Sequence, residues 1–170
     1  MQLATLRFYG GNLKFSAAHF TIFSATKREG LHGHNYSLEA SLQAPLNQPG
    51  LTFDYALFRN KLLLLCKKLH SRFLLPASSP YLEINDQLEH YQIIFNNQFM
   101  LLLKEDVILM PLSNITIEAL SGWFIDQLFQ DQEFINQYRI QQISIKVFNG
   151  LEHSAETHWA AAANNSRGTG

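Results

Sequence analysis

A chain of 170 residues with 46% hydrophobic and 16% charged residues has the composition of one globular domain with a substantial core, which excludes a disordered protein. Its formal net charge of -1 provides no basic surface for nucleic acid or anionic lipid. The lone cysteine, Cys66, excludes an internal disulfide and is typical of a reducing compartment.

The N-terminal sequence lacks the charged and apolar regions of a signal peptide. The longest apolar run, residues 62–66, is too short to cross a bilayer. We therefore expect a cytoplasmic protein with no membrane partner and no nucleic-acid partner.

The first half of the chain predicts two strands and one long helix. Residues 3–15 have strand character around Gly10 and Gly11, and we interpret this interruption as a bulge. Residues 35–43 alternate between apolar and polar side chains, as a half-buried strand does. Residues 53–73 place apolar side chains at helical spacing, and a proline follows as a terminator.

The second half predicts shorter elements. Four short strands are expected, over residues 81–84, 91–95, 99–103 and 107–110. A helix follows over residues 116–130, with Ser113 or Asn114 available to cap its start, and a last strand covers residues 141–148. This order predicts an α+β fold with an antiparallel sheet. We expect one domain over residues 1–160 and a disordered tail over residues 161–170.

Three histidines lie close together in the sequence, as His19 in FSAAHF and as His32 and His34 in LHGHNY. Side chains two apart on a strand point the same way, so His32 and His34 can face one ion, while Gly33 keeps the opposite face clear. His19 would come from the neighbouring strand. Three imidazole ligands with an open fourth position are typical of catalytic zinc, so we predict a Zn²⁺ site.

These histidine motifs resemble the zinc-binding signature of the 6-pyruvoyl-tetrahydropterin and 6-carboxy-tetrahydropterin synthase family. Further segments resemble the family in the same order, namely GLTFD at residues 50–54, LHSRFLLP at 69–76 and EDVILMPLSNITIEALSGWF at 105–124. The resemblance covers residues 5–155.

The resemblance implies a T-fold, in which an antiparallel four-stranded sheet carries two helices on one face. It also implies subunits that assemble into a trimeric barrel and usually a homohexamer, with active sites at the subunit interfaces. Enzymes of the family bind 7,8-dihydroneopterin triphosphate through zinc and eliminate triphosphate. The implied activity is that of a zinc-dependent carbon–oxygen lyase acting on a small dihydropterin.

The family's catalytic cysteine is absent from the segment TKREGLHGH, where Arg28 occupies the place it has in some relatives. Glu29 remains, and family members with a glutamate in this neighbourhood are associated with cleavage of the dihydroneopterin side chain. Glu29 is therefore a candidate general base, with a pKa raised by a desolvated pocket. The alternative is a solvated loop carboxylate beside Lys27 and Arg28.

The family's Asp-His pair for proton transfer corresponds to His70 and Ser71 in KLHSRF, with the imidazole shifted by one position. One residue rotates a helical side chain by about 100°. His70 can therefore occupy the place of the aspartate but not that of the histidine. His70 is a candidate catalytic residue, and the alternative is a cap on the C-terminal end of the helix.

Family enzymes hold the pterin with a glutamate at the end of the last strand. Alignment on that strand places Asn149 there, a small register shift would bring in Glu152, and Glu156 is a third option. An asparagine offers both a donor and an acceptor, so it would recognise a different edge. Thr116 and Glu118 match the family's helix motif and are further substrate-binding candidates, with helix capping as the alternative for Thr116.

Three functions stay open at this point. The first is a working dihydropterin enzyme, of the triphosphate-eliminating or the side-chain-cleaving type. The second is a catalytically degenerate T-fold zinc protein that binds a pterin or purine-like ligand without turnover. The third is an enzyme for a related heterocycle whose edge suits Asn149.

Overall fold

The structure, a computed structural model, describes residues 2–47 and 50–161. The main sheet contains β1 (Leu3–Phe8), β2 (Lys14–His19), β3 (His32–Pro45), β4 (Arg72–Pro76), β8 (Val107–Met110), β9 (Gln142–Asn149) and β10 (His153–Ala160). A small sheet contains β5 (Glu83–Asp86), β6 (His90–Phe95) and β7 (Gln98–Leu103). The helices are α1 (Tyr55–Leu69), α2 (Ile117–Phe129), α3 (Gln132–Gln137) and the short 3-10 helix η1 (Lys104–Asp106).

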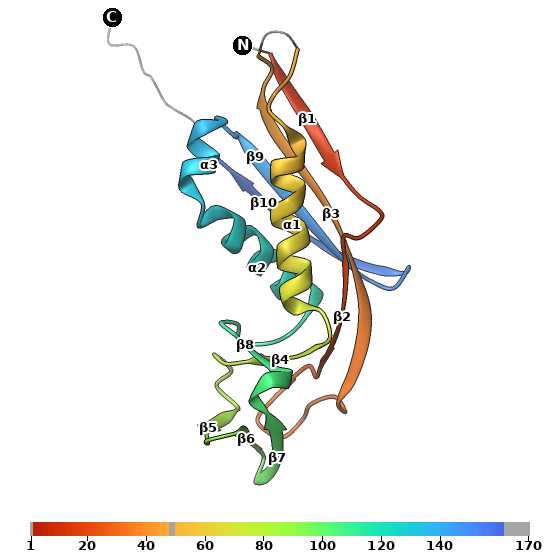
Figure 1. The fold of residues 1–170 in the computed structure, drawn as a ribbon. Helices are drawn as coiled ribbons and strands as arrows, with labels where there is room; N and C mark the ends of the chain where they lie inside the picture. The colour runs from red at the N-terminus through yellow and green to blue at the C-terminus, as the bar shows by residue number, and fades with distance from the viewer. Residues whose placement is uncertain (1, 48–49, 162–170) are drawn as a thin grey trace, which may run out of the picture.

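The main sheet has an antiparallel part and a parallel extension. Its order is β10-β9-β3-β2-β4-β8, and β1 also pairs with β3. The pairings of β10, β9 and β3, and of β3 with β1 and β2, are all antiparallel, which confirms the predicted α+β fold. β4 and β8 continue the sheet in parallel, an extension that the sequence did not predict. Helices α1 and α2 cover one face of the sheet (Figure 1).

β1 and β2 pair one after the other with β3, and an irregular segment separates them. Phe8 is paired with Ala40 and Lys14 with Ser37, so residues 9–13 stand against only two residues of β3. This confirms the interruption predicted at the Gly-Gly step and shows that it is longer than a single-residue bulge.

The irregular segment decides which side chains of β2 face the helices. It adds an odd number of residues relative to β3, and side chains alternate along a strand, so the buried positions change parity between β1 and β2. The buried residues are Phe8 in β1 and then Phe15, Ala17 and His19 in β2. Gly10 and Gly11 have φ values of 69° and 60°, in the left-handed region that favours glycine.

The main core lies between the sheet and the helices. α1 starts after Asp54, whose carboxylate accepts a hydrogen bond from the Ala56 N–H. The buried residues of α1 recur at helical spacing and are Phe58, Leu62, Cys66 and Leu69. α2 starts after Thr116, whose hydroxyl accepts a hydrogen bond from Ala119 N at 3.2 Å. The predicted caps Ser113 and Asn114 are therefore wrong, because the chain becomes helical only after Thr116.

A second hydrophobic cluster connects the small sheet with β4, β8 and the loop that follows β2. Its buried members are Phe20, Ile22, Phe73, Leu75, Ile93, Phe95 and Val107. The small sheet thus braces the loop that leads from β2 to β3. None of the described helices is long and apolar enough to cross a membrane.

Several predicted boundaries are wrong. The helix expected over residues 53–73 ends at Leu69, because residues 72–76 return as a strand parallel to β2. The strand expected over residues 81–84 lies at Glu83–Asp86, and both α3 and β10 were not predicted. A disordered tail was expected over residues 161–170, and residues 162–170 lie outside the part of the chain that the structure describes.

The glycine pair gives a stability test. Gly10→Ala or Gly11→Ala would place a β-carbon in the left-handed region, which costs about 1–2 kcal/mol. We expect each variant to melt roughly 2–8 °C lower by calorimetry. Gly122→Ala is the matched control, since Gly122 lies in α2 with no atom within 4 Å of an added β-carbon, and it should melt at the same temperature or higher. Equal shifts in all three variants would contradict this account of the interruption.

Candidate metal centre and active site

The three histidines predicted to bind metal meet at one end of the β2–β3 pair. His19 ends β2 directly opposite His32, the first residue of β3, and His34 follows two residues later. The ring centroids of His19 lie 4.7 Å from His32 and 5.2 Å from His34. Two adjacent strands therefore bring all three predicted ligands together.

The ring nitrogens lie close enough to share one ion. One nitrogen from each ring lies within 4.8 Å of the others, and His32 Nε2 is 2.9 Å from His34 Nε2. Zinc–imidazole bonds of about 2.0–2.1 Å in tetrahedral geometry place the ligand nitrogens roughly 3.3 Å apart. The set fits zinc after small ring rotations.

Backbone carbonyls fix the tautomers of two of the rings. His19 Nδ1 lies 3.0 Å from the Ile115 oxygen, and His32 Nδ1 lies 2.8 Å from the Gly30 oxygen. A carbonyl only accepts, so both Nδ1 atoms carry the hydrogen and both Nε2 atoms keep a free lone pair. His19 Nε2 is the buried side-chain polar atom that lacks a hydrogen-bond partner within residues 2–47 and 50–161. A metal ion is the partner that this donor set fits.

The environment keeps two of the rings neutral. Burial, followed by repulsion from His32 and His34, lowers the pKa of His19 to about 4. Burial, followed by His32, also lowers the pKa of His34. Neutral imidazole is the form that binds a metal, so these lone pairs are available at neutral pH.

Gly33 is required by the close approach of the two strands. A β-carbon added at Gly33 would lie 3.1 Å from the carbonyl oxygen of Ala17 in β2. The clear face predicted at Gly33 is therefore filled by the neighbouring strand. A side chain there would push apart the pair that aligns His19 with His32.

Glu29 lies beside the metal ligands. Its Oε2 is 3.8 Å from His32 Nε2 and accepts a hydrogen bond from Thr21 N at 3.0 Å. The Glu29 N–H donates to the Thr21 oxygen at 2.9 Å. The backbone of the loop therefore holds Glu29, while 37% of its side-chain surface stays exposed to solvent.

The predicted rise in the pKa of Glu29 is wrong. Burial does raise the pKa of this carboxyl, but hydrogen bonds from Thr21 and the nearby rings of His32 and His19 outweigh burial and hold it below its usual value. The carboxylate is therefore ionised at neutral pH, which is the form that accepts a proton.

Asn114 holds the loop of the site, a role that the sequence analysis did not assign. Its Oδ1 accepts from Ile22 N at 3.0 Å, and its Nδ2 donates to the Ile22 oxygen at 2.8 Å. The next residue, Ile115, supplies the carbonyl that orients His19. The clue was the segment SNIT before α2, in which Asn114 was considered only as a helix cap.

The backbone of His70 closes the end of α1, while its imidazole contacts β2. Its Nδ1 accepts a hydrogen bond from Ser16 N at 3.1 Å, and Ser71 N donates to the Ser16 oxygen at 2.7 Å. The backbone N–H of His70 also closes the end of α1 by donating to Cys66 O. These bonds tie α1 to β2. No contact recorded for the described residues joins His70 to the three histidines.

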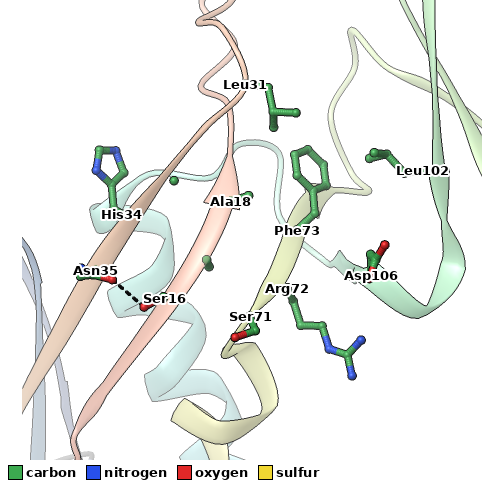
Figure 2. A pocket seen from close by; sticks show the side chains of 12 residues that line it. Ser16, Ala18, Leu31, His34, Asn35, Ser71, Arg72, Phe73, Leu102 and Asp106 are labelled. Carbon is green, nitrogen blue, oxygen red and sulfur yellow. Dashed lines mark hydrogen bonds between the residues drawn. The ribbon is translucent and has the colours of Figure 1, made fainter.

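A hollow of about 500 Å³ lies over β2, β3 and β4, and its lining includes Ser16, Ala18, His34, Asn35 and Ser71. Figure 2 shows His34 and Asn35 on one side of it and Phe73 on the other. Its volume is in the range of small-molecule sites. Ser71 lines this hollow, whereas His70 lines a different one with Lys14 and Lys67.

The two candidates at α2 lie near the residue that orients His19. The Thr116 hydroxyl is engaged as the helix cap, which agrees with the alternative weighed for it. Glu118 is exposed in the first turn of the helix. Both follow Ile115 closely, so the start of α2 forms one border of the site.

The three anchor candidates lie in different places. Asn149 ends β9 opposite Tyr36, a buried ring that contacts His34, so Asn149 shares a face with the metal ligands. Glu152 is exposed in the turn between β9 and β10. Glu156 lies opposite Lys146 and accepts a hydrogen bond from a serine on the other, polar face of the sheet.

A sheet covered by two helices, with three histidines brought together on adjacent strands, defines a class of scaffold with a candidate metal site. The family model for 6-pyruvoyl tetrahydropterin synthase matches residues 11–160, so this chain belongs to that family. The resemblance seen in the sequence is thereby confirmed.

Relatives and solved structures agree with this assignment. A Methanocaldococcus jannaschii protein named "Putative 6-carboxy-5,6,7,8-tetrahydropterin synthase" is 23% identical over 146 residues, which cover 84% of this chain and 88% of that protein. A Pyrococcus horikoshii protein of the same name is 25% identical over 145 residues, covering 84% of each. The 6-pyruvoyl tetrahydropterin synthase of Plasmodium vivax superposes with a TM-score of 0.88 at 26% identity, over 95% of this chain and 100% of that chain. The predicted T-fold is confirmed.

The metal centre is tested by removing its ligands. We expect His32→Ala and His34→Ala each to lose stoichiometric zinc, because two imidazoles hold the ion far more weakly than three. Metal content after dialysis, measured by mass spectrometry, gives the result. His158→Ala, an exposed histidine of β10, is the control and should keep its zinc. One zinc per chain in all three variants would refute the assignment of the ligands.

Proposed function

We propose that this protein is a zinc-dependent dihydropterin enzyme of the 6-pyruvoyl/6-carboxy-tetrahydropterin synthase type, with Glu29 as its general base. The observation that carries the proposal is the position of the Glu29 carboxylate, 3.8 Å from His32 Nε2 and fixed by Thr21 N. A base beside a metal centre can take a proton from a substrate that the metal holds.

Each residue has a distinct part in this proposal. His19, His32 and His34 would hold the metal through their Nε2 atoms. Zinc, when bound, supplies Lewis acidity toward the side-chain hydroxyls of a dihydropterin. Glu29 Oε2 accepts the substrate proton and can return it at a later step, while the Thr21 N–H keeps the carboxylate in place.

The absence of the family's cysteine favours cleavage of the side chain over simple elimination of triphosphate. Arg28 and Glu29 stand in the segment where the cysteine is expected. Among the solved structures similar to this chain are Plasmodium vivax synthase variants in which a catalytic glutamate is replaced, with TM-scores of 0.89 and 0.88. A catalytic glutamate is thus present in a protein with this fold.

The substrate is proposed to be 7,8-dihydroneopterin triphosphate or a related dihydropterin. Asn149 on the face of the metal ligands is the first choice for its heterocycle, with Glu152 in the adjacent turn as the second. Thr116 and Glu118 at the start of α2 would border it. We also propose a trimer or hexamer in the cytoplasm, in which a second subunit completes the site, and His70 at the end of α1 could serve such a neighbouring site.

A binding protein without turnover is the second candidate. The observation that favours it is the separation of His70 from the metal centre, since the described residues of one chain then supply Glu29 alone for proton transfer. The same fold and the same metal centre would serve this function.

The first experiment is incubation of the zinc-loaded protein with 7,8-dihydroneopterin triphosphate, with and without a chelator, and analysis of products by mass spectrometry. We expect a zinc-dependent product that has lost both triphosphate and part of the side chain. A product that has lost triphosphate alone would assign the eliminating type. Zinc-loaded protein that binds the compound unchanged would favour the second candidate.

Removal of the base tests the role of Glu29. Glu29→Gln keeps the shape of the side chain but cannot accept the proton, so we expect the rate of product formation to fall about 10²–10⁴-fold. Zinc content and melting temperature should stay close to those of the unmodified protein. Glu105→Gln, in the exposed helix η1, is the control and should retain full activity. Unchanged turnover in Glu29→Gln would contradict the assignment of Glu29 as the general base.

A further inference from the structure

We propose that Arg28 is a positioning residue that fixes Glu29 by holding its backbone, and that the small sheet β5–β7 supplies part of the support. This proposal rests on the proposed function of Glu29. It gives a role to the residue that replaces the family's cysteine in this chain.

The Arg28 side chain lies over two aromatic rings. Its guanidinium carbon lies 4.8 Å from the ring centroid of Phe20 and 5.7 Å from that of Phe95. Both rings are buried, with exposed fractions of 0% and 5%. A guanidinium over the faces of buried rings is attracted by their quadrupoles and loses little hydration, so its position is well defined.

From this position Arg28 reaches the main chain of the next residue. Its Nη1 donates a hydrogen bond to the Glu29 carbonyl oxygen at 2.7 Å. The backbone of Arg28 also pairs with Ile22 across the loop. Arg28 therefore connects the loop before β3 to Phe95, the last residue of β6, which is far away in the sequence.

All three polar groups of Glu29 are thereby held. The carbonyl accepts from Arg28, the N–H donates to the Thr21 oxygen at 2.9 Å, and the carboxylate accepts from Thr21 N at 3.0 Å. Loss of the Arg28 contact would free the peptide between Glu29 and Gly30. The next peptide carries the Gly30 oxygen that contacts His32 Nδ1, so a change at the Glu29–Gly30 peptide would shift the base relative to the His32 ring beside it.

The test compares Arg28→Met, Arg28→Lys and Phe95→Leu with Lys27→Met as the matched control. Lys27 is the exposed neighbour of Arg28, and its ammonium lies 5.8 Å from the Phe23 ring. Turnover of dihydroneopterin triphosphate is measured together with zinc content. We call the contacts of Arg28 with the Glu29 oxygen and with the rings of Phe20 and Phe95 the clasp. Hydrogen exchange of the amides of residues 21–29 is measured in parallel, because it reports whether the clasp is intact even if the protein has no turnover.

We expect Arg28→Met to lower kcat about 10–100-fold, the loss that accompanies misplacement of a catalytic group by about 1 Å, with KM and zinc content little changed. Arg28→Lys should recover part of the rate, since it keeps the charge but not the planar fork. Exchange should accelerate in residues 21–29 and not in α1 or α2. The double variant with Phe95→Leu should be no slower than Arg28→Met alone, because both changes break one clasp.

The outcomes separate this proposal from the function on which it rests. Faster exchange in residues 21–29 of Arg28→Met, in a protein that shows no turnover, would support the clasp and overturn the proposed function. Unchanged exchange in that segment would overturn the clasp whatever the rates. A large increase in KM with unchanged exchange would show that Arg28 contacts the substrate, which also overturns the positioning role. Lys27→Met should match the unmodified protein in every measurement.

Discussion

The register between β2 and β3 is the constraint on which the metal centre depends. His19 meets the other two ligands only because it lies opposite His32 on the helix side of the sheet. Residues 9–13 decide on which side of the sheet His19 lies. If β1 continued into β2 without this irregular segment, His19 would point to the opposite face. Gly33 then lets the two strands approach closely. A metal site at one end of the sheet is thus specified partly by glycines that never touch the metal.

The site divides its work between rigid strands and a braced loop. The strands carry the three histidines, and carbonyls of Ile115 and Gly30 orient the rings of His19 and His32. The loop carries Glu29, and that loop is fixed on one side by Asn114 and on the other by Arg28. Positions on strands are accurate because the sheet defines them, whereas a loop needs such additional contacts to hold a charged group beside a metal.

Most of the fold and the clustering of the three histidines could be predicted from sequence, because both depend on periodicity and short spacing. The spacing of His32 and His34 places both imidazoles on one face of a strand, and the apolar–polar alternation that follows predicts that strand. The apolar run after Arg72 could not be assigned, since a short buried strand and the end of a helix have the same pattern. The pKa of Glu29 was predicted in the wrong direction because burial is outweighed only by the Thr21 hydrogen bonds together with the rings of His32 and His19, and these contacts depend on loop conformation. The contact between Arg28 and Phe95 joins distant segments, and no local pattern indicates it.

The protein has two hydrophobic clusters, and each supports a different part of the structure. The larger cluster ties α1 and α2 to the sheet, while the smaller one, which includes Phe20 and Phe95, supports the loop of Glu29. A unit with fewer buried side chains opens at a lower free energy than the whole domain. Heating would therefore free the loop of Glu29 before α1 and α2 leave the sheet, so the small cluster and the main core would melt at different temperatures.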